Sequence, residues 1–144
     1  MTIDRYFKAE GYAREEYLGS LSADELLQLG IDLYNAGHYW NAHEAWEEVW
    51  LESERSLRAF YQGLIQVTAA FVHVTHNRYP GAVKLLGEGI AKLEAYPQIM
   101  MGIDLHALLT GARECRQQLL LLGEAGVKDF DRGLIPKITR LASS

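Results

Sequence analysis

The chain has 144 residues, of which 49% are hydrophobic and 23% charged, and it holds one cysteine. These values are typical of one globular domain, and they exclude a disordered chain, an internal disulfide and a cysteine-only metal site. Nineteen acidic and fourteen basic residues give a net charge of −5, which argues against nucleic-acid binding through a general basic field. The whole excess lies between Tyr39 and Glu54, a segment with five acidic residues and no lysine or arginine.

The hydrophobic periodicity predicts helices along most of the chain. Residues 1–20 show no sustained period, and we interpret them as an irregular or partly helical arm. A capping box at Ser22 and Glu25 begins the first clear helix, which a cap at Gly37 ends. Four more helices are expected over 39–53, 57–75, 81–95 and 105–122. A loop over 124–133 and a short helix over 134–141 complete the prediction.

No segment alternates with the period of a β-strand, so the predicted class is all-α. The pattern Gly37-x-Tyr39-x-x-Ala42 recurs forty residues later as Asn77-x-Tyr79-x-x-Ala82. Two copies are too few for a solenoid and favour two similar helical hairpins. We therefore predict one helical domain over 1–144, a compact bundle of about five principal helices built from hairpins. Its parts are the arm (1–20), a core (21–96), and a C-terminal helix and tail (97–144).

Two features of the chain bear on its location. The N-terminal segment mixes charges of both signs and has no apolar stretch of the signal-peptide kind. The longest uncharged run, 59–77, is long enough to span a membrane but contains three histidine or asparagine residues and two glutamines. It is too polar for a span, so we expect a buried helix, no membrane association and a cytoplasmic protein.

The helix over 39–53 carries the clearest candidate site. Its apolar sector includes Trp46 and Trp50, with His43 inside the edge of that sector and Glu47 just beyond it. The spacing i, i+4 brings the His43 and Glu47 side chains together on one turn, which is typical of half of a divalent-metal site. The segment also matches the first half of a His-Glu-x-x-His zinc motif, but Glu47 replaces the second histidine. That replacement argues against a zinc protease.

The helix over 57–75 is the natural place for the remaining ligands. Beside its apolar face runs an uncharged polar stripe that includes Gln62, Gln66 and His73. If this stripe meets the preceding helix, His43, Glu47 and His73 form a metal site, with Gln66, Gln62 and Trp50 around the ligands. A second interpretation stays open, because a buried histidine, glutamate and glutamine can satisfy one another as a structural hydrogen-bond network without any metal.

Several ordered motifs resemble a known family. They are Tyr34 to Glu44, Glu47, Trp50, Tyr61 to Gln66, Asn77 and Gly81 to Leu86. Together they resemble the bacterial and archaeal family called domain of unknown function 309, over about Leu26 to Leu93. Its His-x-x-x-Glu-x-x-Trp pattern corresponds here to His43, Glu47 and Trp50. The resemblance implies an all-helical fold and metal binding by that pattern, and it implies no known activity.

Two functional hypotheses follow. In the first, the His43 and Glu47 cluster binds a divalent metal ion or a small ligand. No nucleotide or organic cofactor is indicated. If the chain is an enzyme, metal-assisted hydrolysis is the simplest reaction for such a site. No catalytic residue can be assigned from the sequence. In the second, the chain is a helical protein-interaction or self-association module, in which the acidic helix or an aromatic surface binds a protein partner or a second copy.

Overall fold

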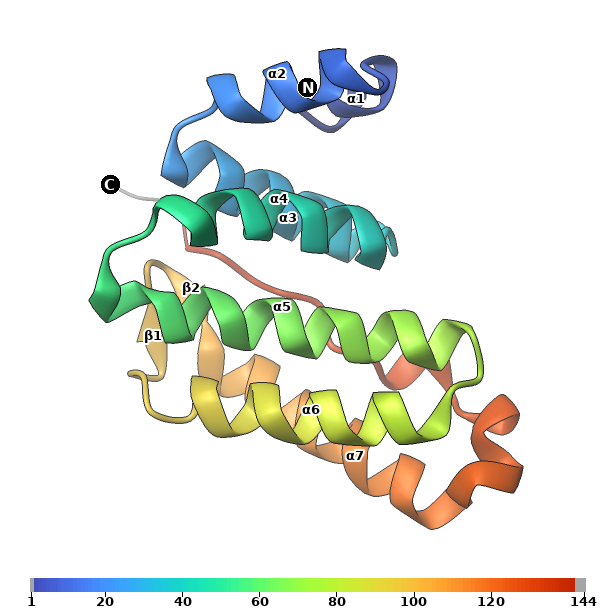
Figure 1. The fold of residues 1–144 in the computed structure, drawn as a ribbon. Helices are drawn as coiled ribbons and strands as arrows, with labels where there is room; N and C mark the ends of the chain where they lie inside the picture. The colour runs from blue at the N-terminus through green and yellow to red at the C-terminus, as the bar shows by residue number, and fades with distance from the viewer. Residues whose placement is uncertain (1, 142–144) are drawn as a thin grey trace.

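The computed structural model describes residues 2–141 and confirms the all-α class (Figure 1). This part of the chain forms seven α-helices and one short β-hairpin. The elements are α1 (Thr2–Lys8), α2 (Tyr12–Ser20), α3 (Ala23–Asn35), α4 (Tyr39–Glu52), α5 (Arg55–Thr75), α6 (Tyr79–Leu93), β1 (Ile99–Met100), β2 (Ile103–Asp104) and α7 (Leu105–Gly126). Helices α3 to α7 are the five principal helices that the periodicity predicts, and α1 and α2 are additional.

Successive helices pack against each other along the chain. Helix α3 contacts α4, α4 contacts α5, α5 contacts α6, and α6 contacts α7. Figure 1 shows α1 and α2 above α3 and α4, with α5, α6 and α7 below. The closest pair is α5 and α6, where a Cβ atom on Gly89 would lie 2.9 Å from the carbonyl oxygen of Gly63. Glycine at both positions therefore lets the two backbones approach.

The repeated motif forms the same turn in two hairpins. Gly37, between α3 and α4, and Asn77, between α5 and α6, both have a positive φ, of 86° and 55°. After Gly37 the amide of His38 donates to the carbonyl of Leu33 at 2.8 Å, and after Asn77 the amide of Arg78 donates to that of His73 at 2.9 Å. Each turn is thus a helix C-cap of the left-handed kind that glycine and asparagine favour.

The N-terminal arm is helical rather than irregular. Tyr6 of α1 is fully buried, and its hydroxyl donates a hydrogen bond of 2.8 Å to Oε1 of Glu44 on α4. Arg14 of α2 donates from Nε to the carbonyl oxygens of Tyr6 and Ala9. These contacts fix the two short helices to each other and to α4. The contact of Tyr6 with Glu44 joins residues far apart in the sequence, so the local pattern of residues 1–20 does not indicate it.

The predicted helix over 134–141 is wrong. A 3₁₀ turn, Arg132–Leu134, is followed by an extended segment. Pro136 cannot donate a backbone hydrogen bond and restricts the residue before it to extended conformations. Its ring fits over Gly111 of α7, where a Cβ atom would lie 2.5 Å away. Helix α7 also continues beyond 122, although its dihedral angles are interrupted at Gly123, where φ is 69°.

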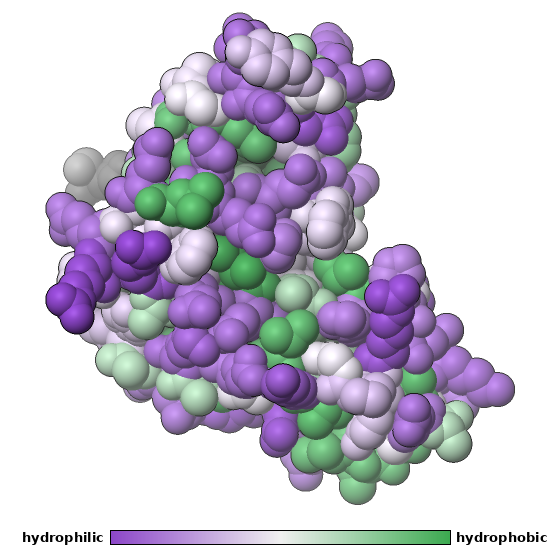
Figure 2. Space-filling model, in the orientation of Figure 1, coloured by the Kyte–Doolittle hydropathy of each residue, from purple (hydrophilic) through white to green (hydrophobic). Residues whose placement is uncertain are grey.

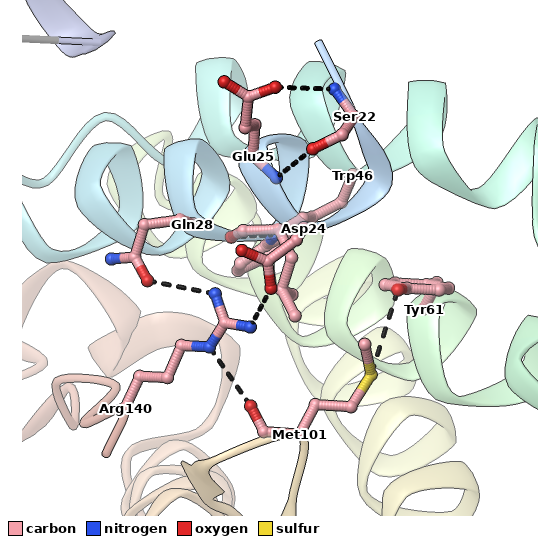
Figure 3. A network of polar contacts seen from close by, with 9 residues as sticks. Ser22, Asp24, Glu25, Gln28, Trp46, Tyr61, Met101 and Arg140 are labelled. Carbon is pink, nitrogen blue, oxygen red and sulfur yellow. Dashed lines mark hydrogen bonds and ion pairs between the residues drawn. The ribbon is translucent and has the colours of Figure 1, made fainter. Parts of the chain in front are cut away.

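Arg140 fastens the extended C-terminal segment to α3 (Figure 3). Its guanidinium donates to Oε1 of Gln28 at 3.1 Å and forms an ion pair with Asp24, while Nε donates to the carbonyl oxygen of Met101 at 3.1 Å. Met101 belongs to the turn of the hairpin β1–β2, which the sequence analysis did not predict. That turn holds two residues of positive φ, Met101 and Gly102, as a two-residue hairpin connection requires.

The capping box at the start of α3 is confirmed and appears in the same view (Figure 3). Glu25 N donates to the Ser22 hydroxyl at 3.1 Å, and Ser22 N donates to the Glu25 carboxylate at 3.0 Å. The uncharged run 59–77 forms most of α5, one of the most buried helices. Among the described residues, no helix is long and apolar enough to cross a membrane.

Candidate functional site

His43 and Glu47 form the predicted pair on α4. The distance from His43 Nε2 to Glu47 Oε1 is 2.9 Å, and the His43 side chain is 17% exposed against 50% for Glu47. Their position follows from the packing of α4, because Ala42, Trp46 and Val49 are buried. The helix is thereby rotated so that His43 lies at the margin of the core and Glu47 reaches solvent.

An aromatic side chain covers the pair from one side. The indole of Trp40 stacks on the imidazole of His43, with ring centroids 5.1 Å apart and an angle of 20° between the planes. Trp40 is 59% exposed. The spacing of the two residues, three positions apart on a helix, is the sequence signal that corresponds to this contact.

Gln66 of α5 lies at the same level along the helix pair as His43 of α4. Two contacts fix the register of the antiparallel helices: the Tyr39 ring lies 5.9 Å from that of Phe71, and the Arg58 guanidinium lies 5.0 Å from the Trp50 ring centre. Between these contacts, Gln66 lies at the level of His43. Its Nε2 donates to Oε2 of Glu88 on α6 at 3.2 Å. Glu88 is thus a polar neighbour that the sequence analysis missed.

Four buried side-chain atoms lack a hydrogen-bond partner in the described part of the chain. They are His43 Nδ1, Trp50 Nε1, Gln66 Oε1 and His73 Nδ1. Buried polar atoms in folded proteins are nearly always hydrogen-bonded, so each exception needs an explanation. All four belong to α4 and α5, and all four residues are members of the site that the sequence predicts. The polar groups of these two helices are therefore incompletely satisfied by the protein itself.

His73 does not join the pair. It lies two turns beyond Gln66, about 10 Å along α5, and its imidazole packs on Gly81 of α6, where a Cβ atom would lie 2.9 Å away. Burial, followed by the nearby charges of Arg78 and His76, lowers the pKa of His73. Within residues 2–141, no three His, Cys, Asp or Glu side chains are grouped so that they could hold a metal ion. The structure thus provides two of the three predicted ligands together.

The acidic residues of α4 differ in their roles. Glu44, which the helical projection places on the outer face, accepts the hydrogen bond from Tyr6, and Asn41 Nδ2 donates to the same Tyr6 hydroxyl at 3.0 Å. Burial is the main cause that raises the pKa of Tyr6. Glu44 therefore anchors α1 of the N-terminal arm to α4 through this hydrogen bond. At least one acidic residue of α4 thus has a structural role.

Figure 2 shows that the face seen in Figure 1 is mostly hydrophilic, with several hydrophobic patches, one of them between the upper and lower helices and another at the lower edge. The protein is therefore an all-helical bundle of successive hairpins, with a polar pair, His43 and Glu47, at the margin of α4. The family model described as domain of unknown function (DUF309) matches residues 27–85, from α3 into α6. The match covers less than half of the chain and supports the resemblance of its motifs to that family. No curated protein and no solved structure gives a significant match.

Proposed function

We propose that the chain is a cation-binding domain in which His43 and Glu47 chelate a divalent metal ion at the solvent edge of α4. The observation that carries the proposal is the 2.9 Å separation of His43 Nε2 and Glu47 Oε1. Two donor atoms that each lie about 2.1 Å from a metal ion, at right angles to one another, are about 3 Å apart. The pair thus has the spacing of neighbouring positions in a coordination sphere, and water or a small ligand would fill the others.

The unpartnered atoms support this assignment. A metal ion on Nε2 of His43 leaves the proton on Nδ1, which then needs an acceptor, as metal-binding histidines generally have. Gln66 Oε1 is an unpartnered acceptor at the same level of the facing helix. A direct hydrogen bond or one bridging water between the two atoms would satisfy both. The Glu88 carboxylate accepts from Nε2 of the same amide, which leaves Oε1 as its free acceptor.

Calorimetric titration of the untagged, chelator-treated chain with Zn²⁺ and with Mn²⁺ tests the proposal. Glu47→Gln removes the ligand charge at an exposed position, and Glu48→Gln is its matched control on the same helix. We expect at least tenfold weaker binding in Glu47→Gln and His43→Ala, and unchanged binding in Glu48→Gln. A metal ion at one hundred times its Kd should also stabilise the unaltered chain by about 2.7 kcal/mol. Absence of binding, or equal loss in both glutamate variants, would overturn the proposal.

A second candidate function, a protein-interaction or self-association module, rests on the exposure of Trp40. Trp40 lines a small hollow together with His38, and the ring of His38 lies 4.9 Å from that of Phe7. In this case Trp40→Ala lowers the molar mass measured by light scattering or abolishes capture of a partner. Tyr12→Ala, at another exposed aromatic residue, leaves both the molar mass and the capture unchanged. His43→Ala would then cost about 1–3 kcal/mol of stability and have no other effect.

A further inference from the structure

Helices α6 and α7 form the walls of an open groove that is a second candidate site, apart from the His43–Glu47 pair. A hollow of about 730 Å³ lies between them, a size common among small-molecule sites. Its polar lining includes Lys84 and Glu88 of α6, Glu94 directly after α6, and Arg113 and Arg116 of α7. Its apolar lining includes Ile90 and Leu120. The hollow therefore combines an apolar wall with several fixed charges.

Arg116 is held with its charged end available. Its Nε donates to the carbonyl oxygen of Val83 at 3.3 Å, which fixes the plane of the guanidinium. Glycine at position 87 provides the space, because a Cβ atom there would lie 3.0 Å from Nε and 3.3 Å from Nη2 of Arg116. No residue between 2 and 141 accepts a hydrogen bond from either terminal nitrogen. The half-buried guanidinium thus presents two unpaired donors.

The acidic residues of the hollow are already engaged. Glu94 pairs with Arg113 at 3.1 Å, and Glu88 accepts the hydrogen bond from Gln66. Arg116 and Lys84, by contrast, have no acidic partner among the described residues. Gln66 is neutral and leaves the charge of Glu88 in place, but three basic side chains against two acidic ones still make the net charge of the hollow positive. Its most oriented donor is a guanidinium, whose fork matches a carboxylate.

We infer that this hollow binds a small amphipathic organic anion. Its carboxylate would accept two hydrogen bonds from Arg116, and its apolar body would cover Ile90 and Leu120. Leu120 is 49% exposed, so the ligand would remove apolar surface from water as well as pair a charge. Lys84 at the margin contributes attraction without a fixed geometry.

Nuclear magnetic resonance titrations with octanoate and with octan-1-ol test this inference on the full chain. The two probes share an apolar chain and differ in the head group. We expect octanoate to shift the amide signals of Gly87, Ile90 and Leu120, with a Kd at least tenfold lower than that of octan-1-ol. Arg116→Gln should weaken octanoate binding at least tenfold and leave octan-1-ol unchanged.

Two further variants separate geometry from charge. Gly87→Ala keeps every charge and favours the helix, but its methyl group displaces the guanidinium, so we expect several-fold weaker octanoate binding. Arg113→Gln removes an equal charge from the same hollow and should change the Kd by less than threefold. His43→Ala should have no effect, so this site can fail or hold independently of the metal site. Equal binding of the two probes, or equal losses in Arg116→Gln and Arg113→Gln, would overturn the inference.

Discussion

The indole of Trp46 occupies the space directly above Gly30, where a Cβ atom would lie 2.0 Å from Trp46 Nε1. The same nitrogen donates a hydrogen bond of 3.2 Å to the carbonyl oxygen of Leu27. Both acceptor and glycine belong to α3, so one indole sets the separation of α3 and α4 and satisfies its own polar atom. The rotation of α4 that places His43 at the edge of the core depends on this contact.

Gly30→Ala should therefore destabilise the fold. Alanine favours a helix over glycine by about 1 kcal/mol, yet the added methyl group meets a fully buried ring that has no room to move. We expect a net loss of about 1–3 kcal/mol in the free energy of unfolding, measured by urea denaturation. Gly19→Ala is the control, because nothing lies within 4 Å of a Cβ atom there. A stability equal to that of this control would contradict the steric argument.

Asn35 should be essential for holding the C-terminal segment. Its Nδ2 donates to the carbonyl of Ile138, and its Oδ1 accepts from the amide of Ile138, both at 2.8 Å. Asn35→Ala removes both bonds, and we expect a loss of about 1–3 kcal/mol together with faster amide exchange over 135–141. Lys137→Ala, which removes one exposed bond to the backbone of Asn35, should leave exchange nearly unchanged. Equal exchange rates in the two variants would contradict this role.

The parts of the fold that could be predicted are those with local causes. A capping box needs two residues three positions apart, and the His43–Glu47 pair needs one helical turn, so both follow from the sequence. The C-terminal segment could not be predicted in this way, because its conformation depends on Asn35 and on Gly111. These residues are distant in the sequence and their contacts leave no periodic pattern.

For the candidate site, too, only the part within one helix could be predicted from the sequence. The polar stripe of α5 is real, but a helical projection does not say which neighbour each residue faces. Gln66 donates to α6 while lying level with His43, and His73 packs on Gly81 two turns further on. Both residues therefore contact α6, at two levels of the helix, and the stripe as a whole does not form one site with His43 and Glu47 on α4. Only the three-dimensional packing shows this.

Cys115 should be almost unreactive in the folded chain. It is fully buried, its thiol donates to the carbonyl of Leu134 at 3.4 Å, and burial, aided by Glu114 and Asp131, raises its pKa to about 12. The thiolate is the reactive form, so its fraction falls roughly a thousandfold relative to an ordinary thiol. We expect very slow reaction with Ellman's reagent in buffer and rapid reaction in guanidinium chloride. Similar rates in both would show that the thiol is accessible.

His73 should make stability depend on pH. Its pKa is lowered in the folded chain, chiefly by burial, so the unfolded chain binds the proton more tightly. Stability is therefore greatest above the ordinary histidine pKa of about 6.5 and is lost as pH falls from there toward the lowered value. The urea concentration at the unfolding midpoint of the unaltered chain should decrease as the pH is lowered from 8 to 5.

His73→Gln removes the titrating group from the contact with Gly81 while keeping a polar side chain. We expect the urea midpoint of this variant to vary less with pH than that of the unaltered chain. His106→Gln is the matched control, because His106 is an exposed histidine on α7, and it should retain the full dependence. If His73→Gln and His106→Gln have the same pH profile, the neutral imidazole packed on α6 does not contribute to the loss of stability in acid.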